Sequence, residues 1–368
     1  MKPSTLSRTP LYQYHLAHGA RMVEFAGWEM PMLYGSIIEE HLQVRRSGGV
    51  FDVSHMGRLA FAGPDAGSVL ERLCTRAITT MAQGQCRYSL VCDDDGGCRD
   101  DTLVYRLAPQ RYLMVCNAAN RIKLLQHIDQ VRGELDFDLC DETFDTLMLA
   151  LQGPKVIDTL SSVAGEIAAL KRYRFLTRDL LGARVMISRT GYTGEDGVEM
   201  IVPTVAAGDL VDLLGRFDSV ISPAGLGARD TLRMEAAMPL YGHELTEDLD
   251  PLAAGLTFAV KLDKGEADDA GSFIGQEALR EIARRGPRRT LAGLRLAGRR
   301  TARQGMVVRR DGGEIGRVTS GCLSPTLGVP IAMAYLDAAH AEIGGTVQVD
   351  LGRTSVRADV VALPFYKR

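Results

Sequence analysis

The sequence predicts an α+β protein of several domains whose sheets are antiparallel. The chain has 368 residues, of which 46% are hydrophobic, so it can bury more than one core and is too long for one simple domain. Strand-like runs are joined by short glycine-rich turns, which is typical of antiparallel hairpins. In the last ~80 residues, short strands alternate with glycine turns, which favours a C-terminal β-barrel or jelly-roll-like domain.

A helix is predicted over residues 36–46. Ser36 and Glu39 have the spacing of a capping box, in which each side chain accepts a hydrogen bond from the backbone N–H of the other residue. The apolar residues that follow recur at an approximately helical period, so one face of this helix is expected to be buried.

Residues 52–140 are predicted to form a ferredoxin-like sub-domain. Leu59 and Phe61 alternate as in a strand, and the helical pattern that follows begins near Asp65, a residue type that favours helix N-termini. The runs "YSLVC" and "TLVYRL" then flank the turn "DDDGG", and the strand-like run "RYLMVC" precedes a second helical pattern. This order of strands and helices resembles a split βαβ arrangement.

The remaining segments predict two more domains. From residue 143 onward, "TFDTLMLALQGP", "ARVMISRT" and "VEMIVP" have the pattern of strands, with helices near 154–170 and 206–216. The composition changes after residue 246, where a linker leads into the C-terminal barrel. We therefore expect three domains with these boundaries: residues 1–51 plus 141–245, residues 52–140, and residues 246–368.

Composition and charge exclude several classes of function. The formal net charge is −3 and no apolar run approaches the ~18 residues of a membrane span, so neither a nucleic-acid nor a membrane partner is expected. The seven cysteines have no C-x-x-C spacing and the seven histidines form no paired-ligand motif, which disfavours a disulfide framework and a metal site. The N-terminus lacks the apolar core of a secretory signal, so a cytoplasmic location is expected.

The segment "RTGYTGEDGVE", residues 189–199, places three glycines and three carboxylates between two strand-like runs. The glycines suit a hairpin turn, because glycine adopts a positive φ without steric cost. On the second strand, Val198, Met200 and Val202 share one face, which places Glu199 on the opposite face. A carboxylate there either faces water or binds a ligand that offers two adjacent donors.

A second acidic group, Asp100 and Asp101, enters a strand directly after the "DDDGG" turn. The acids of the turn lack EF-hand spacing, so they are interpreted as solvated. Asp101 precedes a run of apolar residues, which can draw it partly out of water and make it an orienting or proton-handling group. The alternative is a strand-end cap without a chemical role.

The run "PAGLGARD" predicts a tight turn before a helix that starts near Ala228. Arg229 then falls at the N-terminal end of that helix, where a positive charge does not complement the helix dipole. This departure favours a ligand or an ion pair as the partner of Arg229.

A strongly basic stretch follows in the C-terminal third of the chain. Residues 280–310 carry eleven arginines against the single acid Glu281. The stretch is either a solvated face or a surface for an acidic protein, since no aromatic residue interleaves with the arginines to stack nucleic-acid bases.

Seven motifs occur in order along the chain: "FAGWEMP" (25–31), "FDVSHMG" (51–57), "DDTLVYR" (100–106), "VCNAANR" (115–121), "SRTGYTGEDGVE" (188–199), "PAGLGARD" (223–230) and "VTSGCLSPTLG" (318–328). Together they resemble the aminomethyltransferase family, the T-protein of the glycine cleavage system. The resemblance runs nearly end to end, and the ordered set is far more specific than any one motif.

The resemblance implies a tetrahydrofolate site in the discontinuous domain. The 2-amino group and ring N–H of a pterin form a donor pair that matches the two oxygens of a carboxylate, and the resemblance gives this role to Glu199. Arg229 matches the family's second ligand-binding position, and Asp101 matches its catalytically important aspartate. By the same resemblance, five further residues border the folate: Tyr192, Tyr88, Met56, Asn117 and, near the folate tail, Tyr366.

The implied reaction takes an aminomethyl group held as S–CH₂–NH₂ on the lipoyl arm of the H-protein. Its transfer to tetrahydrofolate yields 5,10-methylenetetrahydrofolate, ammonia and dihydrolipoyl H-protein. No metal and no flavin are implied. The lipoylated H-protein is the implied partner, it is expected to be acidic, and residues 280–310 are its candidate docking surface.

Two rival functions share the same folate-binding body. A folate-binding protein of iron–sulfur maintenance carries a cysteine in a K-G-C-x-x-G-Q-E-like stretch, whereas "GSFIGQEA" has Phe273 and Ile274 here. The folate half of a sarcosine or dimethylglycine oxidase needs a flavin domain, and the sequence contains no flavin-binding segment. The chain departs from the family in a longer loop within "LDKGEADDAGSFIGQEAL" and in three cysteines near the site: Cys86, Cys92 and Cys98.

Overall fold

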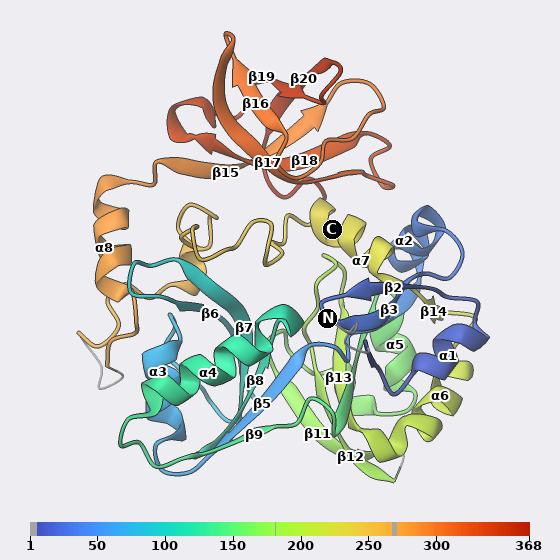
Figure 1. The fold of residues 1–368 in the computed structure, drawn as a ribbon. Coiled ribbons are helices and arrows are strands. Elements are labelled where there is room, and N and C mark those ends of the chain that lie inside the picture. The colour runs from blue at the N-terminus through green and yellow to red at the C-terminus, as the bar shows by residue number, and fades with distance from the viewer. Residues whose placement is uncertain (1–5, 181, 267–270) are drawn as a thin grey trace.

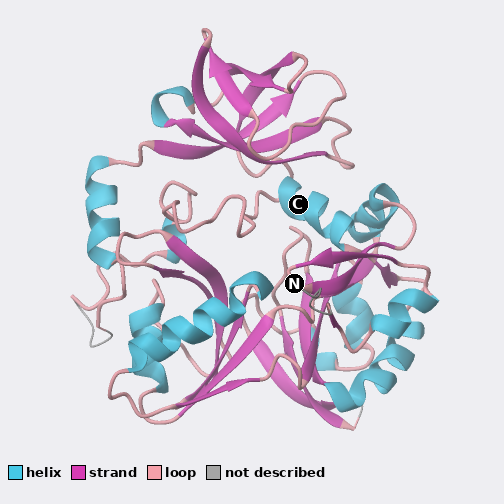
Figure 2. Ribbon diagram, viewed as in Figure 1, coloured by secondary structure: helices cyan, strands magenta, loops and turns pink. Residues whose placement is uncertain are grey.

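Two sheets packed face to face form the body of the molecule, and helices cover their outer sides (Figures 1 and 2). A buried apolar layer joins the sheets, with Phe51 and Ile201 contributed by one and Tyr105 and Val115 by the other. The computed structural model describes residues 6–180, 182–266 and 271–368. Its mixture of antiparallel sheets, covering helices and a separate barrel confirms the predicted α+β fold with several domains.

The first of these sheets has six strands in the order β11-β12-β13-β10-β4-β14. Its outer face packs on apolar residues of α1, α5 and α6, while α2 and α7 contact each other beside the edge at β14. The strands are β4 (Gly48–Asp52), β10 (Thr146–Gln152), β11 (Phe175–Leu180), β12 (Ala183–Ser188), β13 (Gly197–Pro203) and β14 (Ile221–Pro223); the helices are α1 (Tyr12–Ala17), α2 (Ile37–Arg46), α5 (Val156–Ser161), α6 (Ala207–Gly215) and α7 (Leu226–Glu235).

The second sheet has five strands in the order β6-β7-β8-β5-β9, with α3 and α4 on its outer face. Because β5 pairs antiparallel with both β8 and β9, those two strands run parallel on either side of it, and β8-α4-β9 is a split βαβ unit. The elements are β5 (Gly57–Ala62), α3 (Ala66–Leu73), β6 (Cys86–Cys92), β7 (Cys98–Ala108), β8 (Arg111–Cys116), α4 (Arg121–Arg132) and β9 (Asp138–Asp141).

Two predicted helix starts behave differently. Ser36 caps α2, since its side-chain oxygen accepts a hydrogen bond from the backbone N–H of Glu39 at 3.5 Å, as the sequence predicts. Asp65 occupies the N-cap position of α3, but its carboxylate accepts from the backbone N–H of Asp136 at 2.9 Å instead. That side chain therefore ties the start of α3 to the segment that follows α4.

A small sheet in the order β1-β3-β2 lies at the N-terminal end of the described chain, where the sequence reading predicts no element. Trp28 and Met30 of β3 are buried, and β3 contacts α7. Its strands are β1 (Ser7–Arg8), β2 (Arg21–Phe25) and β3 (Trp28–Leu33).

The C-terminal segment forms the predicted closed barrel, in the order β15-β18-β17-β16-β19-β20, which lies above the two sheets in Figure 1. Helix α8 (Gln276–Arg285) leads into it, and residues 267–270 of the preceding long loop lie outside the described residues. The strands are β15 (Arg289–Leu296), β16 (Val307–Arg310), β17 (Gly313–Leu323), β18 (Pro330–Asp337), β19 (Thr346–Asp350) and β20 (Ser355–Val361); short 3₁₀ helices are η1 (Ala118–Asn120), η2 (Gly165–Ile167), η3 (Thr204–Ala206), η4 (Thr257–Ala259) and η5 (Ala338–His340).

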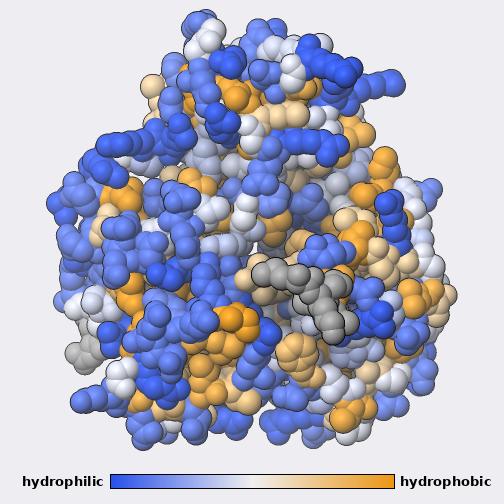
Figure 3. All heavy atoms as spheres, in the orientation of Figure 1, coloured by the Kyte–Doolittle hydropathy of each residue, from blue (hydrophilic) through white to orange (hydrophobic). Residues whose placement is uncertain are grey.

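The face of the molecule seen in Figure 1 is covered mainly by hydrophilic residues, with apolar groups scattered among them (Figure 3). In the described part of the chain, no helix is both long enough and apolar enough to cross a membrane.

Candidate functional site

Two carboxylates project from the facing sheets into the layer between them. On β13, Glu199 shares a face with Ile201, which packs in the inter-sheet core, while the alternate residues pack against the outer helices. On β7, Asp101 likewise shares a face with Tyr105 of the same core. Strand alternation alone thus brings two acids from distant parts of the sequence to one side of each sheet.

Glu199 is buried, with 8% of its surface exposed, so the alternative that it faces water is wrong. Its Oε2 accepts a hydrogen bond from the Thr190 hydroxyl at 2.6 Å. The pairing of β12 with β13 explains this contact. Glu199 lies opposite Ser188 in the two strands, and Thr190 follows Ser188 by two residues at the start of the hairpin turn. A buried carboxylate needs polar partners, and the hydroxyl supplies only one of them.

Arg229 lies in the first turns of α7, close to Glu199 and Tyr192. Its guanidinium stands over the Tyr192 ring at 4.8 Å from the ring centroid, in a cation–π contact. Burial lowers the pKa of Arg229, and the charge of Glu199 opposes that effect. The Nη1 atom is buried and has no hydrogen-bond partner among the described residues, which marks it as a donor that a ligand would satisfy.

Asp101 is held in place by two neutral side chains. The Tyr88 hydroxyl donates to Oδ2 at 3.1 Å, and the Asn117 amide donates to Oδ1 at 2.8 Å. The same amide also donates to Oδ1 of Asp100 at 2.8 Å, so Asn117 bridges the two acids. Asp101 is therefore not a simple strand-end cap, since its carboxylate takes part in a defined hydrogen-bonded group.

Asp100 is the acid whose importance the sequence reading missed. It is fully buried on the opposite face of β7 and accepts from the Asn117 backbone N–H at 3.1 Å and from the Asn120 amide at 2.6 Å. The alternation of β7 offers a signal for it, because Asp100 is in phase with Thr102 and Val104, both buried. An acid in that phase must be either protonated or well supplied with donors.

The two neighbouring acids of β7 both have raised pKa values. Burial and the charge of Asp101 raise the pKa of Asp100 to about 8, although the amide donors oppose the shift. Burial also raises the pKa of Asp101, against the hydrogen bonds from Asn117 and Tyr88. Two neighbouring buried carboxyls cannot both ionise easily, so a carboxyl such as that of Asp100 is able to give and take a proton near neutral pH.

Tyr192 connects the two ends of the site. Burial raises the pKa of its hydroxyl, Arg233 opposes that rise, and the charge of Asp101 reinforces it. The hydroxyl donates to the backbone oxygen of Pro239. Because the ring also contacts Arg229, Tyr192 lies between the Asp101 end and the Glu199 end.

Met56 and Tyr366 complete the set of predicted residues. Met56 follows β4 and packs in the inter-sheet core with Ile201 and Ala228, next to the elements that carry Glu199 and Arg229. Tyr366 lies elsewhere: its hydroxyl donates to Glu195 at 3.2 Å and its ring stacks under Arg45. No contact joins Tyr366 to the other predicted site residues within the described chain.

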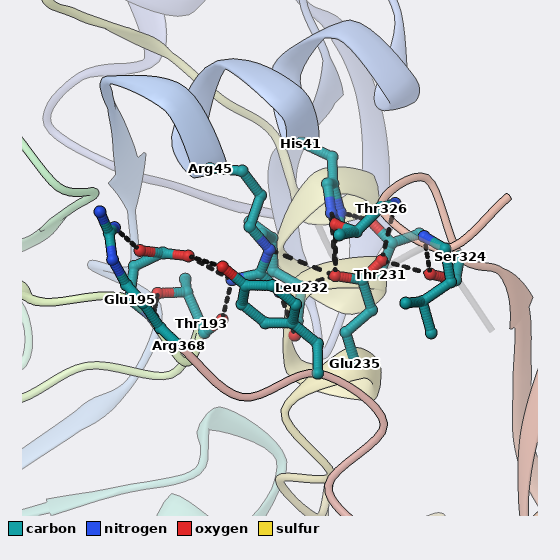
Figure 4. Close-up of polar contacts among 12 residues, drawn as sticks. His41, Arg45, Thr193, Glu195, Thr231, Leu232, Glu235, Ser324, Thr326 and Arg368 are labelled. Atoms are coloured by element: carbon teal, nitrogen blue, oxygen red, sulfur yellow. Dashed lines mark hydrogen bonds and ion pairs between the residues drawn. The ribbon is translucent and has the colours of Figure 1, made fainter.

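Glu195 belongs to a separate buried network that Figure 4 shows. Arg45 of α2 pairs with Glu195 at 3.0 Å and with Glu235 of α7 at 2.8 Å, and Arg368 also pairs with Glu195. Glu235 in turn accepts from the hydroxyls of Ser324 and Thr326 in the barrel domain. The network therefore joins the turn of the Tyr192 hairpin to α2, α7, the barrel and the C-terminal segment.

The three cysteines singled out in the sequence are all free and buried. Burial raises the pKa of the Cys86 thiol to about 12, and it also raises the pKa values of Cys92 and Cys98 well above the ordinary value of a thiol. These thiols are therefore poor nucleophiles. Within the described residues, no group of three or more His, Cys, Asp or Glu side chains is placed to hold a metal ion.

Comparisons with known proteins agree with this geometry. Residues 11–264 match the family model "GCVT N-terminal domain", and residues 289–367 match "Glycine cleavage T-protein C-terminal barrel domain". The chain is 48% identical to an aminomethyltransferase of Rubrobacter xylanophilus over 99% of its length and 95% of that protein. An aminomethyltransferase of Moorella thermoacetica is 45% identical, with 99% and 98% covered.

A solved structure shows the same fold over nearly the whole chain. The glycine cleavage system aminomethyltransferase T from Bartonella henselae superposes with a TM-score of 0.91, at 34% sequence identity, and 98% of each chain is covered. These full-length matches do not favour either rival function. The chain belongs to the aminomethyltransferase family, the T-proteins of the glycine cleavage system.

Proposed function

We propose that this chain transfers the aminomethyl carbon from the lipoyl arm of an aminomethylated H-protein to tetrahydrofolate. The products are 5,10-methylenetetrahydrofolate, ammonia and the dihydrolipoyl carrier. The observation that carries the proposal is that the buried Glu199 and the guanidinium of Arg229 lie close together at one end of a site whose other end holds Asp100 and Asp101. A cytoplasmic location remains a prediction.

Glu199 and Arg229 supply complementary groups for a pterin. The carboxylate of Glu199 accepts from the 2-amino group and the adjacent ring N–H, a bidentate arrangement that fixes orientation as well as affinity. The buried Nη1 of Arg229 offers the ligand a hydrogen-bond donor that no described residue of the protein satisfies. Tyr192, Tyr88, Met56 and Asn117 border the bound folate in this proposal, and Tyr366 is placed toward its tail.

Asp101 acts at the reacting end, where Tyr88 and Asn117 hold its carboxylate still. The new carbon–nitrogen bonds replace two N–H bonds of the folate, and those two hydrogens end on the lipoyl sulfur and on ammonia. An acid pair that keeps one proton near neutral pH can deliver it to the departing amine and stabilise the positive charge that develops on the transferred carbon. The enzyme otherwise contributes orientation of two reactants.

The lipoylated H-protein is the proposed partner. Docking on residues 280–310 remains a prediction, and the structure limits which arginines can serve it. Arg280, Arg284 and Arg289 pair with acids that include Glu266, Glu277 and Asp337, all outside the stretch. Arg299 and Arg300, in the loop after β15, are among the members that form no ion pair in the described chain, and charge reversal of these two at low salt tests the prediction.

The test is ammonia release from aminomethylated H-protein. We expect release only when tetrahydrofolate is present, with 5,10-methylenetetrahydrofolate formed in equal amount. Release that does not depend on folate, or folate binding without any turnover, would contradict the proposal and favour a non-catalytic folate-binding role. Oxidation of sarcosine or dimethylglycine in the presence of a flavin subunit would favour the second rival.

A further inference from the structure

Basic side chains from two distant segments meet along the free edge of β6. The backbone N–H of Cys86 donates to the oxygen of Tyr173 at 3.0 Å, that of Phe175 donates to Gly84 at 2.9 Å, and Gln85 pairs with Arg174. These bonds join the start of β6 to residues 171–175. The residues gathered there, here called the β6 basic surface, are Arg76, Arg87, Lys171, Arg172 and Arg174.

The charges of this surface are not neutralised within the protein. Nearby Arg178 pairs with Glu166, and Arg189 pairs with Asp196, but no residue of the β6 basic surface forms an ion pair within the described chain. Arg87 donates instead to the backbone oxygen of Ala77 and to Thr80. Burial and then the charge of Arg76 lower the pKa of Arg87, the charge of Glu71 opposes this shift, and the charge of Arg174 adds to it.

Two large aromatic side chains are exposed beside these charges. Phe258 is 62% exposed and Tyr173 is 49% exposed. Tyr173 also has a left-handed backbone, with φ of 57°, a conformation that a bulky residue keeps only when its surroundings impose it. Arginine and tyrosine are the residue types most enriched where a few side chains carry the energy of a protein–protein interface.

A pocket on this surface lies near the proposed reaction site. It has a volume of about 440 Å³ and is lined by Arg76, Arg87 and Phe258, among others. The Phe258 ring stacks on the ring of Tyr88 with centroids 6.1 Å apart, and the Tyr88 hydroxyl donates to Asp101. The pocket is thus separated from the Asp101 carboxylate by two stacked rings.

The charge of the whole chain indicates what kind of partner fits. The formal net charge is −3, so a local group of five cations contrasts with the rest of the molecule. A basic area on an otherwise slightly acidic protein steers an acidic protein surface toward one orientation. Nucleic acid fits less well, because its binding relies on an overall positive field.

We propose that the β6 basic surface, with Phe258 and Tyr173, is where an acidic carrier protein docks to present its substrate arm to Asp101. This inference rests on the proposed function, and it places docking beside β6 rather than on residues 280–310. The arginines bind carboxylates of the carrier, and the exposed rings pack against its apolar surface.

The experiment compares one reaction with two forms of the aminomethyl donor. Ammonia release is measured with the donor on the carrier protein and with the same group on free dihydrolipoamide. In the double variant Arg76→Glu/Arg87→Glu, the apparent KM for the carrier should rise about tenfold at low ionic strength, and the difference should shrink as salt is added. The KM values for free dihydrolipoamide donor and for folate should stay unchanged.

Three further variants make the result specific. Arg76→Lys/Arg87→Lys keeps the charge and should retain most of the carrier affinity. Arg184→Glu/Arg216→Glu makes the same change of net charge at exposed arginines of β12 and the segment after α6, and should leave the carrier KM unchanged. Arg299→Glu/Arg300→Glu tests the competing surface directly.

Several results would overturn the inference. An unchanged carrier KM in Arg76→Glu/Arg87→Glu would do so, as would a rise only in Arg299→Glu/Arg300→Glu. An equal loss of activity with both donors would mean that Arg76 and Arg87 support the reaction site or the fold. The folate affinity and the thermal unfolding midpoint would then distinguish these two cases. The inference would also be overturned if the variant Arg76→Glu/Arg87→Glu lost binding of single-stranded nucleic acid while its kinetics with the carrier stayed unchanged. Failure of the unmodified protein with both donors would instead refute the proposed function.

Discussion

Asp100 and Glu235 are both buried carboxylates, yet their surroundings drive their pKa values in opposite directions. Burial and the adjacent Asp101 raise the pKa of Asp100 to about 8, and its donors are neutral amides. Burial would also raise the pKa of Glu235, but hydrogen bonds and charge from His41, with hydroxyl donors from the barrel, lower it to about 2. The charge of the neighbours decides the outcome more than the depth of burial does.

The opposite pKa shifts suit the two acids to different roles, Glu235 to holding the fold together and Asp100 to proton transfer. Glu235 holds α2, α7 and the barrel together, and it can do this at any ordinary pH because it stays ionised. Burial raises the pKa of both Asp100 and Asp101, and these two acids lie at the proposed reaction site, where proton transfer is needed. Four substitutions test this difference between the two acids.

The largest expected effect is that of Asp101→Asn. An amide keeps the shape but can no longer release or accept the proton, so turnover should fall about 10²–10⁴-fold while folate still binds. Stopped assays of ammonia release at saturating folate and carrier measure the loss. Asp94→Asn, in the solvated turn before β7, is the matched control and should keep normal turnover. Full activity in Asp101→Asn would remove Asp101 from the mechanism.

Glu235→Gln should mainly damage the fold. Removing the charge leaves His41 without its buried carboxylate partner and Arg45 with only Glu195, and the loss of one member of a buried pair costs about 3–5 kcal/mol of unfolding free energy. Denaturant unfolding measures it. Glu314→Gln, which breaks an exposed pair with Arg317, should cost less than about 1 kcal/mol. Similar losses in both variants would argue against the structural role of Glu235.

Glu199→Gln should weaken folate binding more than it slows turnover. A glutamine cannot accept both pterin donors, so about 1.5–3 kcal/mol of binding free energy should be lost, roughly a 10- to 150-fold rise in Kd. Calorimetric titration with tetrahydrofolate provides the measurement, with Glu166→Gln as an exposed control. The pterin contact would have to be abandoned if Kd changed less than about twofold.

Asp100→Asn should change how the stability of the protein depends on pH. The folded pKa of about 8 lies above the usual value of 3.8, so between those limits the folded state binds more protons and stability falls as pH rises. The neutral amide of Asn removes this dependence. Unfolding midpoints measured from pH 5 to 8.5 should decline more steeply for the unmodified protein than for the variant. Parallel curves would show that Asp100 does not carry the proton.

Much of the fold follows from patterns that are local in the sequence. The capping box at Ser36 predicts α2. Alternation along β13 predicts that the Glu199 side chain lies on the other face of the sheet from Val198 and Met200. The glycine-rich turns predict the hairpins, and the even spacing of short strands predicts the C-terminal barrel. In each case the neighbouring residues carry the information, because hydrogen bonding and side-chain phase are set within a few residues.

The parts that sequence reasoning missed depend on contacts between distant segments. The donors of Asp100 come from Asn117 and Asn120, which reach it only after β8 has paired with β7. The burial of Glu199 likewise depends on the second sheet packing over it. Tyr366 contacts Glu195, 171 residues earlier, and no local pattern indicates that pairing.

The contacts of Glu195 have a consequence for truncation of the chain. The turn that carries Tyr192 is held by Arg45 of α2 and by Tyr366 and Arg368, which lie far from it in the sequence. A variant shortened before Tyr366 keeps only the Arg45 side of these contacts. Under the proposed function, its affinity for folate should therefore fall.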